Sequence, residues 1–273
     1  MSAVVLAASG DEFTPPGPAD FDLPPIGGGS SFEFLGQEMT LGVTKPMLQI
    51  VIFAGLVFAF LYLASRKRAM VPGKLQYVGE SAYGFVRNSL GRDIIGSHDF
   101  QRFTPYLVSL FFLVLFNNWA ASIPFVQFPT FSRAGLVYGL AAVSWIVYNY
   151  VGIRKHGFLG YLKLQVLPSG VTGPILILIV PLEFFSNLIV RPVTLALRLL
   201  CNMFAGHLLL ILFALGGEYL LLHGAGLVKP VGILAWVLFA AVFFLELLIQ
   251  FLQAYVFTLL TAMYIAGALA DEH

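Results

Sequence analysis

The sequence contains little cysteine and little charge. Cys201 is its one cysteine, so the chain forms no internal disulfide and no cysteine-based metal cage, which needs several thiolates or histidines at short spacing. Asp, Glu, Lys and Arg make up 11% of the 273 residues, whereas soluble domains carry about a quarter. The net charge of +1 comes without a basic face, so nucleic acid is not expected as a partner.

The chain also lacks the motifs of several enzyme classes. No Gly-rich phosphate loop ending in Lys-Ser or Lys-Thr is present, so the chain is expected to hydrolyse no nucleotide by itself. Neither H-E-x-x-H nor G-x-S-x-G occurs, which removes support for a zinc or serine hydrolase site. We therefore expect no catalytic site, no metal and no cofactor within this chain.

Apolar residues, in contrast, are abundant. They make up 59% of the chain, and the mean hydropathy is +0.87, which predicts an all-α membrane protein with several crossings. A helix needs about 20 residues to cross a hydrocarbon core of about 30 Å. Three apolar segments have about this length and two are far longer. The five predicted spans are residues 47–64, 104–123, 135–152, 173–215 and 227–270.

The segments outside the spans have compositions of their own. Residues 1–45 are rich in Pro, Gly and acids, which predicts an irregular extracytoplasmic tail before a single transmembrane domain over residues 46–273. Between Pro72 and Leu90 apolar residues recur at helical spacing, as in an amphipathic helix on the cytoplasmic surface. The loops assigned to the cytoplasm hold ten Lys and Arg and the outer ones three. The positive-inside rule then places the N-terminus outside and the C-terminus in the cytoplasm.

The last two apolar segments are too long to stand upright in a bilayer. Their 43 and 44 residues would extend roughly 65 Å each as helices. Either each segment breaks into two spans, with Pro192 as one candidate break, or each is one bent helix tilted beyond the usual angle of about 20°. Apart from Arg191-Pro192, neither segment has a polar turn at its middle. We therefore favour a strongly tilted antiparallel helical hairpin over residues 171–270.

The run RPVTLALRLLCNMFAGH, from Arg191 to His207, places two arginines inside an apolar stretch. A guanidinium stays charged and costs on the order of several kcal/mol in hydrocarbon unless it faces a partner or a wet cavity. Arg198 is therefore a candidate functional residue. At about 100° per residue, Arg191, Thr194, Arg198 and Asn202 share one helix face, whereas His207 points the opposite way.

The last apolar segment carries a second polar face. Its members are Glu246, Gln250, Gln253 and Tyr264. An antiparallel pairing centred near residue 226 sets Arg198 opposite Gln253 and His207 opposite Glu246. Such groups can simply join helices by hydrogen bonds. For Arg198, Glu183, His207 and Glu246 together we favour an ion pathway, because charges at membrane depth mark such pathways far more often than scaffolding.

These residues resemble those of a known family. The motif from Arg191 to His207 is similar to that of subunit a of the F-type ATP synthase, the stator protein that carries protons to and from the rotating c-ring. The likeness extends through PLEFF at Pro181, the polar face of the last segment and the ending ADEH, and it covers residues 32–273.

The resemblance implies roles for the residues around Arg198. Arg198 itself matches the family's essential arginine, which faces the c-ring carboxylate. Asn202 matches the neighbouring asparagine, and Gln253 the glutamine that lies close to the arginine. Thr194 takes the place of a small hydroxyl residue.

The resemblance also implies a proton path. Glu183 sits where the family has an acid in the aqueous access channel, with one more residue before Pro192 than is common, which a local bulge can absorb. His207 and Glu246 occupy two positions that hold one acid and one histidine in either order. With Glu183 they would form the titrating relay of the outer half-channel. The expected path also includes Gln250, Asn117 and Asn118.

The implied function is that of a stator with two offset aqueous half-channels, in which Arg198 prevents a direct proton leak between them. The implied partners are the c-ring, the subunit b peripheral stalk, the soluble ATPase sector and membrane lipid. The implied location is the bacterial plasma membrane. A stand-alone secondary ion-coupled transporter with a midplane site remains the alternative, although no inverted repeat is evident in the sequence.

Overall fold

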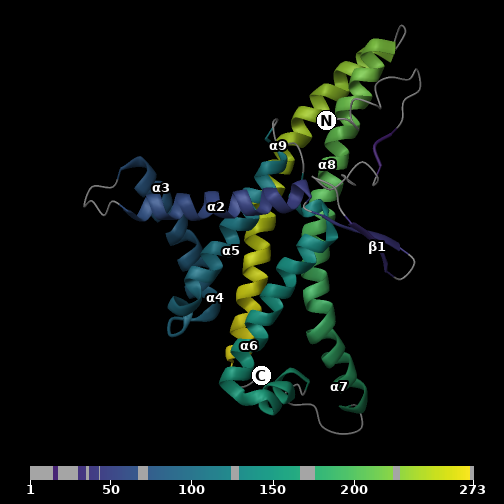
Figure 1. Cartoon of the computed structure of the whole chain (residues 1–273). Coiled ribbons are helices and arrows are strands. Elements are labelled where there is room, and N and C mark those ends of the chain that lie inside the picture. Colours follow the sequence, from purple (N-terminus) through teal and green to yellow (C-terminus); the bar gives the residue numbers. More distant parts are fainter. Residues whose placement is uncertain are drawn as a thin grey trace. The chain divides into compact units, whose positions relative to one another are not determined.

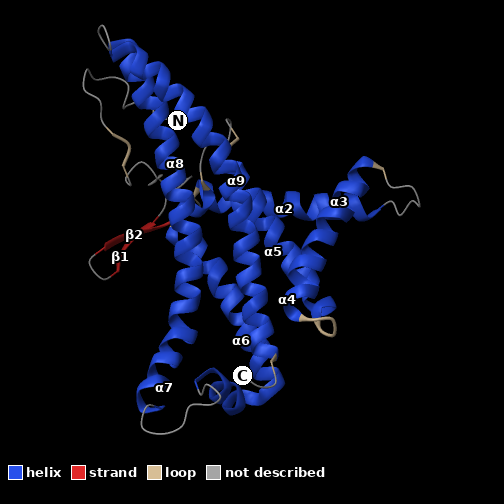
Figure 2. Ribbon diagram, turned by 180° about the vertical axis from the view of Figure 1, so that it is seen from behind, coloured by secondary structure: helices blue, strands red, loops and turns tan. Residues whose placement is uncertain are grey.

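The computed structural model describes residues 15–17, 30–34, 37–42, 44–66, 73–123, 129–166, 176–223 and 228–270 (Figure 1). Much of the predicted N-terminal tail and the midpoint of the predicted hairpin, near residue 226, lie outside these residues. The described elements are helices apart from one small pair of strands (Figure 2). Five helical runs are long and apolar enough to cross a membrane. The predicted all-α membrane architecture with five spans is therefore confirmed.

The observed spans are centred close to the predicted ones. Their bounds are α2 (Lys45–Arg66), α5 (Phe100–Ala121), α6 (Ala134–Val166), the run of α7 (Leu176–Phe185), η4 (Ser186–Val190) and α8 (Arg191–His223), and α9 (Val228–Leu269). The largest difference is in α6, which continues well past the predicted end at Gly152. The residues after Gly152 mix apolar and charged side chains, and a hydropathy pattern alone therefore underestimates the helix.

Neither of the two long segments divides into two spans. The residues from Leu176 to His223 are helical throughout, and Pro192 lies in the first turn of α8 without breaking the run. A π-helical turn, η4, comes directly before Arg191. It is a bulge of the kind expected between Glu183 and Pro192, because a π turn absorbs one extra residue. The strong tilt of these helices stays a prediction.

The predicted amphipathic helix is present in two parts. It begins as α3 (Lys74–Phe85) and continues as the π-helical turn η2 (Val86–Arg92), followed by the short α4 (Asp93–Ile95). Val86 and Leu90 are completely buried, whereas Leu75 and Val78 are exposed. Only the C-terminal part of the predicted apolar face is therefore covered by the protein. Its place on the cytoplasmic surface stays a prediction.

A short antiparallel hairpin lies within the segment predicted to be irregular. Strand β1 (Ser30–Phe34) pairs with β2 (Gln37–Leu41), with Phe32 opposite Met39. The composition of the whole tail conceals this local feature. Residues 30–41 contain no proline, so every backbone N–H in them is available for strand pairing.

The chain divides into two compact units. The first comprises residues Met1–Ile52, Asn117–Arg133 and Cys201–Leu252, and the second Phe53–Phe116, Ala134–Leu200 and Gln253–His273. Four of the five spans contribute residues to both units. The single transmembrane domain expected over residues 46–273 stays a prediction.

Within the first unit, α8 and α9 run antiparallel in close contact. A Cβ added to Gly217 would lie 2.9 Å from the Trp236 ring, and one added to Gly232 would lie 2.8 Å from the Leu221 side chain. These glycines therefore let the helices approach more closely than larger residues would. Both contacts agree with a helical hairpin centred near residue 226, as the sequence predicts.

Within the second unit, α6 bends sharply at Gly157, where φ is +72°. The bend brings Tyr161 back onto Gly152, whose missing side chain makes room for the ring, since an added Cβ would lie 2.1 Å from it. Phe103, Tyr148 and Ile265 form one buried hydrophobic cluster of this unit. The bend therefore directs the last turns of α6, with Tyr161 and Gln165, toward the rest of the unit.

Replacing Gly157 with alanine is expected to destabilise the protein. Gly157 has φ +72° and ψ 165°, a backbone conformation almost restricted to glycine that costs a residue with a Cβ about 1–3 kcal/mol. The thermal denaturation midpoint of the purified protein should therefore fall. Gly160→Ala is the matched control, because its Cβ would meet only His156 at an ordinary 3.6 Å and alanine is the better helix former. Equal midpoints for the two variants would contradict the role of the bend.

Candidate functional sites in the two units

A chain of polar side chains surrounds Glu246 in the first unit. The Ser122 hydroxyl donates to Gln250 Oε1 at 3.1 Å, and Gln250 Nε2 donates to Glu246 Oε1 at 3.2 Å. Asn118 Nδ2 donates to the Gln250 backbone carbonyl at 3.2 Å. The amide of Gln250 thus links a hydroxyl beyond the end of α5 to a carboxylate on α9.

The Glu246 carboxylate is only 5% exposed. Its Oε2 atom is buried and has no hydrogen-bond partner among the described residues. The carboxylate lies against α8, where a Cβ on Gly206 would come within 2.9 Å of it. A glycine at position 206 therefore leaves the space that the acid occupies. His207 follows Gly206 and is half-buried, and its predicted pairing with Glu246 stays a prediction.

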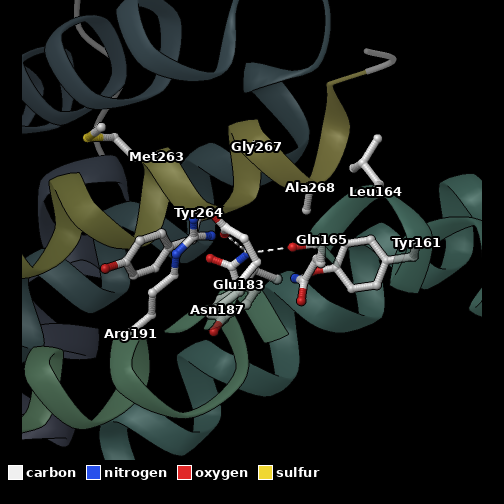
Figure 3. A pocket seen from close by; sticks show the side chains of 11 residues that line it. Tyr161, Leu164, Gln165, Glu183, Asn187, Arg191, Met263, Tyr264, Gly267 and Ala268 are labelled. Atoms are coloured by element: carbon white, nitrogen blue, oxygen red, sulfur yellow. Dashed lines mark hydrogen bonds between the residues drawn. The ribbon is translucent and has the colours of Figure 1, made fainter. Parts of the chain in front are cut away.

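A second polar cluster surrounds Glu183 in the other unit. Asn187, one turn after Glu183, donates through Nδ2 to Glu183 Oε2 at 3.1 Å and to the Gln165 backbone carbonyl at 2.6 Å (Figure 3). Gln165 in turn donates to the Tyr161 hydroxyl. Asn187 is therefore the residue that joins Glu183 to the last turn of α6.

These residues line a cavity of about 470 Å³ that also contains Arg191 and Tyr264 (Figure 3). The Arg191 guanidinium lies over the Tyr264 ring, 5.4 Å from its centroid, which is within the range of a cation–π contact. Tyr148 lines the same cavity. An acid, a cation and three phenols thus share one hollow of the second unit, which can hold water.

Arg198 lies on an exposed face of α8, beside the exposed Thr194. Among the described residues no carboxylate lies within ion-pair distance of Arg198. The Thr194 hydroxyl donates within its own helix, to the backbone carbonyls of Val190 and Arg191. Asn202 is half-buried. The cation is therefore presented outward from this chain.

The polar side chains of α9 are buried along one face of the helix. Glu246, Gln250 and Gln253 are 5%, 1% and 7% exposed, whereas Phe244 and Leu248 on the other side are 71% and 65% exposed. Gln253 Nε2 has no hydrogen-bond partner among the described residues. Its predicted closeness to Arg198 stays a prediction.

The structure gathers some predicted site residues and adds others. Glu246, Gln250 and Asn118 meet in the first unit, and Asn117 is completely buried beside Asn118. Glu183 belongs to a different cluster, in the second unit. The sequence reasoning missed Ser122, Gln165, Asn187 and Tyr161. Asn187 carries a sequence signal, since it follows Glu183 by four residues and so shares its helix face, whereas Ser122 and Gln165 lie at helix ends without periodicity.

Replacing Asn187 with leucine is expected to lower the thermal denaturation midpoint by several degrees. The Gln165 carbonyl and Glu183 Oε2 would lose their donor, and an unsatisfied buried acceptor costs about 1–3 kcal/mol. Asn149→Leu is the control, since Asn149 donates to the Trp145 carbonyl one turn earlier in its own helix and does not join two segments there. If both variants have the same denaturation midpoint as the parent protein, the Asn187 hydrogen bonds do not stabilise the contact between the Glu183 helix and the end of α6.

Comparison with known proteins supports the sequence resemblance. The family model of the ATP synthase A chain matches residues 47–266. The chain is 68% identical over 273 residues to ATP synthase subunit a of a Nocardioides species, a match that covers all of this chain and 99% of the relative.

More distant relatives carry the same name. ATP synthase subunit a of Pseudarthrobacter chlorophenolicus is 46% identical over the full length of both chains. The protein of that name from Streptomyces lividans is 38% identical, over 96% of this chain and 89% of its own. The family match spans nearly all the described helices, including both polar clusters and Arg198. The chain is an integral membrane protein that belongs to the ATP synthase subunit a family.

Proposed function

We propose that this chain is the proton-translocating stator subunit of a rotary F-type ATP synthase in the bacterial plasma membrane. It would offer two offset half-channels to the carboxylates of the c-ring, with Arg198 between them. The observation that carries this proposal is the exposed Arg198 on a membrane-spanning helix, with no carboxylate partner among the described residues. A permanent charge at that depth needs a counter-charge, and a rotor acid would supply it.

The c-ring carboxylate has to remain neutral while it faces lipid, because an ionised carboxylate in hydrocarbon costs many kcal/mol. Next to Arg198 the ionised form is favoured, because a nearby opposite charge stabilises it. The proton therefore leaves the rotor on one side of Arg198 and is regained on the other. Arginine itself cannot relay the proton, since it does not deprotonate in proteins. It acts as a positive gate that blocks a leak.

The outer half-channel would run through the Glu246 cluster. Ser122 follows α5, which ends on the outer side if the spans alternate from an external N-terminus. The row Ser122, Gln250 and Glu246 offers donors and acceptors in sequence, and the buried Glu246 Oε2, without a hydrogen-bond partner among the described residues, can take up a proton. Asn118 holds the row in place, and His207 would complete it.

The inner half-channel would run through the Glu183 cavity. Gln165 lies at the end of α6 and Ala268 at the end of α9, and both ends face the cytoplasm under the same alternation. This assignment revises the expectation that Glu183 joins His207 and Glu246 in the outer relay. The physical reason is position along the chain, since Glu183 lies only seven residues after the start of α7. Under the same alternation α7 begins on the cytoplasmic side, so a residue this close to its start would not lie at the outer mouth.

In the assembled complex this chain would contact several partners. The exposed face of α8 that carries Thr194 and Arg198 would contact the c-ring. The subunit b peripheral stalk would hold the chain against rotation and link it to the soluble ATPase sector, and lipid would cover the remaining apolar surface. Nucleotide hydrolysis would take place in that soluble sector and not in this chain.

Arg198→Ala is expected to abolish ATP-driven proton pumping by the assembled complex, because the rotor acid would lose the counter-charge that Arg198 offers it. The measurement is acidification of inverted membrane vesicles, with recovery of the c-ring alongside the chain as a check of assembly. Arg154→Ala, at an exposed position of α6, should pump normally. Unchanged pumping by assembled Arg198→Ala complexes would refute the proposal.

Exchanging His207 and Glu246 is expected to keep more proton flux than removing either one. The exchange preserves one acid and one imidazole across α8 and α9, whereas each single replacement by alanine leaves the other without its titrating partner. Flux is measured in the same vesicles for all three variants. An equal loss in all three would argue against a coupled pair.

A further inference from the structure

The helix turn between Glu183 and Arg191 is wider than an α-helical turn. In η4 (Ser186–Val190) the Arg191 backbone N–H donates to the Ser186 carbonyl, five residues back instead of four. Wide turns of this kind are rare and often occur at functional sites. Here the turn lies between the acid and the cation of the cavity (Figure 3).

Pro192 and Trp145 account for the hydrogen bonding of this turn. In a regular α-helix the N–H of residue 192 would donate to the Leu188 carbonyl, but proline has no N–H. A carbonyl left unpaired at membrane depth is costly. The Trp145 indole Nε1 donates to this carbonyl at 3.1 Å. A side chain from α6 thus provides the donor that the proline lacks.

The wide turn changes which residue faces the cavity. Glu183 lies eight residues before Arg191, which in a regular helix places the two about 80° apart around the axis. Absorbing one residue leaves an effective separation of seven, or about 20°. Glu183 and Arg191 can then line the same cavity, as observed, with Asn187 donating to the acid. In a regular helix Phe184 would take the place of Glu183.

We propose that Trp145 is a positioning residue: its indole N–H keeps η4 open by satisfying the Leu188 carbonyl, and the open turn directs Glu183 into the cavity with Arg191. Trp145 itself touches no transferred proton. The expected effect on proton flux rests on the function proposed above for Glu183. The effect on the direction of the side chain does not depend on that function.

Two variants separate positioning from simple hydrogen bonding. Trp145→Phe keeps an aromatic side chain but loses the N–H donor. ATP-driven pumping by the complex in inverted vesicles should fall roughly 10-fold, in line with the sensitivity of such sites to small displacements. Adding Pro192→Ala supplies a backbone N–H to Leu188. Trp145→Phe should also assemble less well, because the Leu188 carbonyl loses its donor. The double variant should regain assembly, because the carbonyl is satisfied, but not pumping, because the turn closes as a regular helix. Trp119→Phe, at an exposed tryptophan, is the control.

The direction of the side chain can be read by thiol labelling. In a Cys201→Ser background, Glu183→Cys or Phe184→Cys is introduced and treated with a water-soluble thiol reagent. With Trp145 and Pro192 present, position 183 should react, because it borders the cavity. Position 184 is 41% exposed in the chain but should be shielded by lipid in the intact membrane. In the Trp145→Phe, Pro192→Ala background the reactivity should move to position 184.

Each remaining outcome has a definite meaning. If the double variant regains both assembly and pumping and position 183 stays reactive, Trp145 only satisfies a carbonyl and the proposal is overturned. Unchanged pumping and labelling in Trp145→Phe would overturn it as well. If the reactivity moves to position 184 while pumping is unaffected, the positioning role stands and the proposed role of Glu183 in proton transfer fails.

Discussion

Polar groups at membrane depth have to find partners inside the protein, and this requirement explains most of the structure. Hydrocarbon offers no hydrogen bonds, so each unpaired N–H, carbonyl or charge is costly there. Gln250 meets the requirement for Glu246, Asn187 does so for Glu183, and the indole of Trp145 does so for a carbonyl next to a proline. Arg198 stands apart, because it is exposed and meets no carboxylate among the described residues. Its partner is therefore to be sought on another chain.

Glycine makes the close approaches on which these contacts depend. Gly206 leaves the space for the Glu246 carboxylate, and Gly217 leaves it for the Trp236 ring. Gly152 accommodates Tyr161, and the positive φ of Gly157 turns the end of α6 so that Gln165 reaches Asn187. Small residues at helix contacts are characteristic of membrane proteins, where close packing has to replace the hydrophobic effect. These glycines therefore affect both how closely the helices pack and where the polar side chains lie.

The two polar clusters differ in a way that suits two half-channels. The Glu246 cluster is a narrow row of direct hydrogen bonds on buried side chains. The Glu183 cluster borders a cavity of about 470 Å³ with a cation at its wall. A row of side chains can pass a proton between fixed groups, whereas a cavity of this size can admit water. In the proposed function the first would deliver protons from outside and the second would release them toward the cytoplasm.

The sequence by itself determined the five spans, the length of the last two helical runs, the buried polar stripe of α9 and the hairpin register near residue 226, because hydropathy and helical periodicity act along one chain segment at a time. It also placed one extra residue between Glu183 and Pro192, where the π turn η4 occurs. Only the tertiary structure joined Ser122 to Gln250, Asn187 to Gln165 and Trp145 to Leu188. These pairs come from segments far apart in the chain, and their contacts depend on how each helix is rotated and bent, as α6 is at Gly157, which no local pattern records.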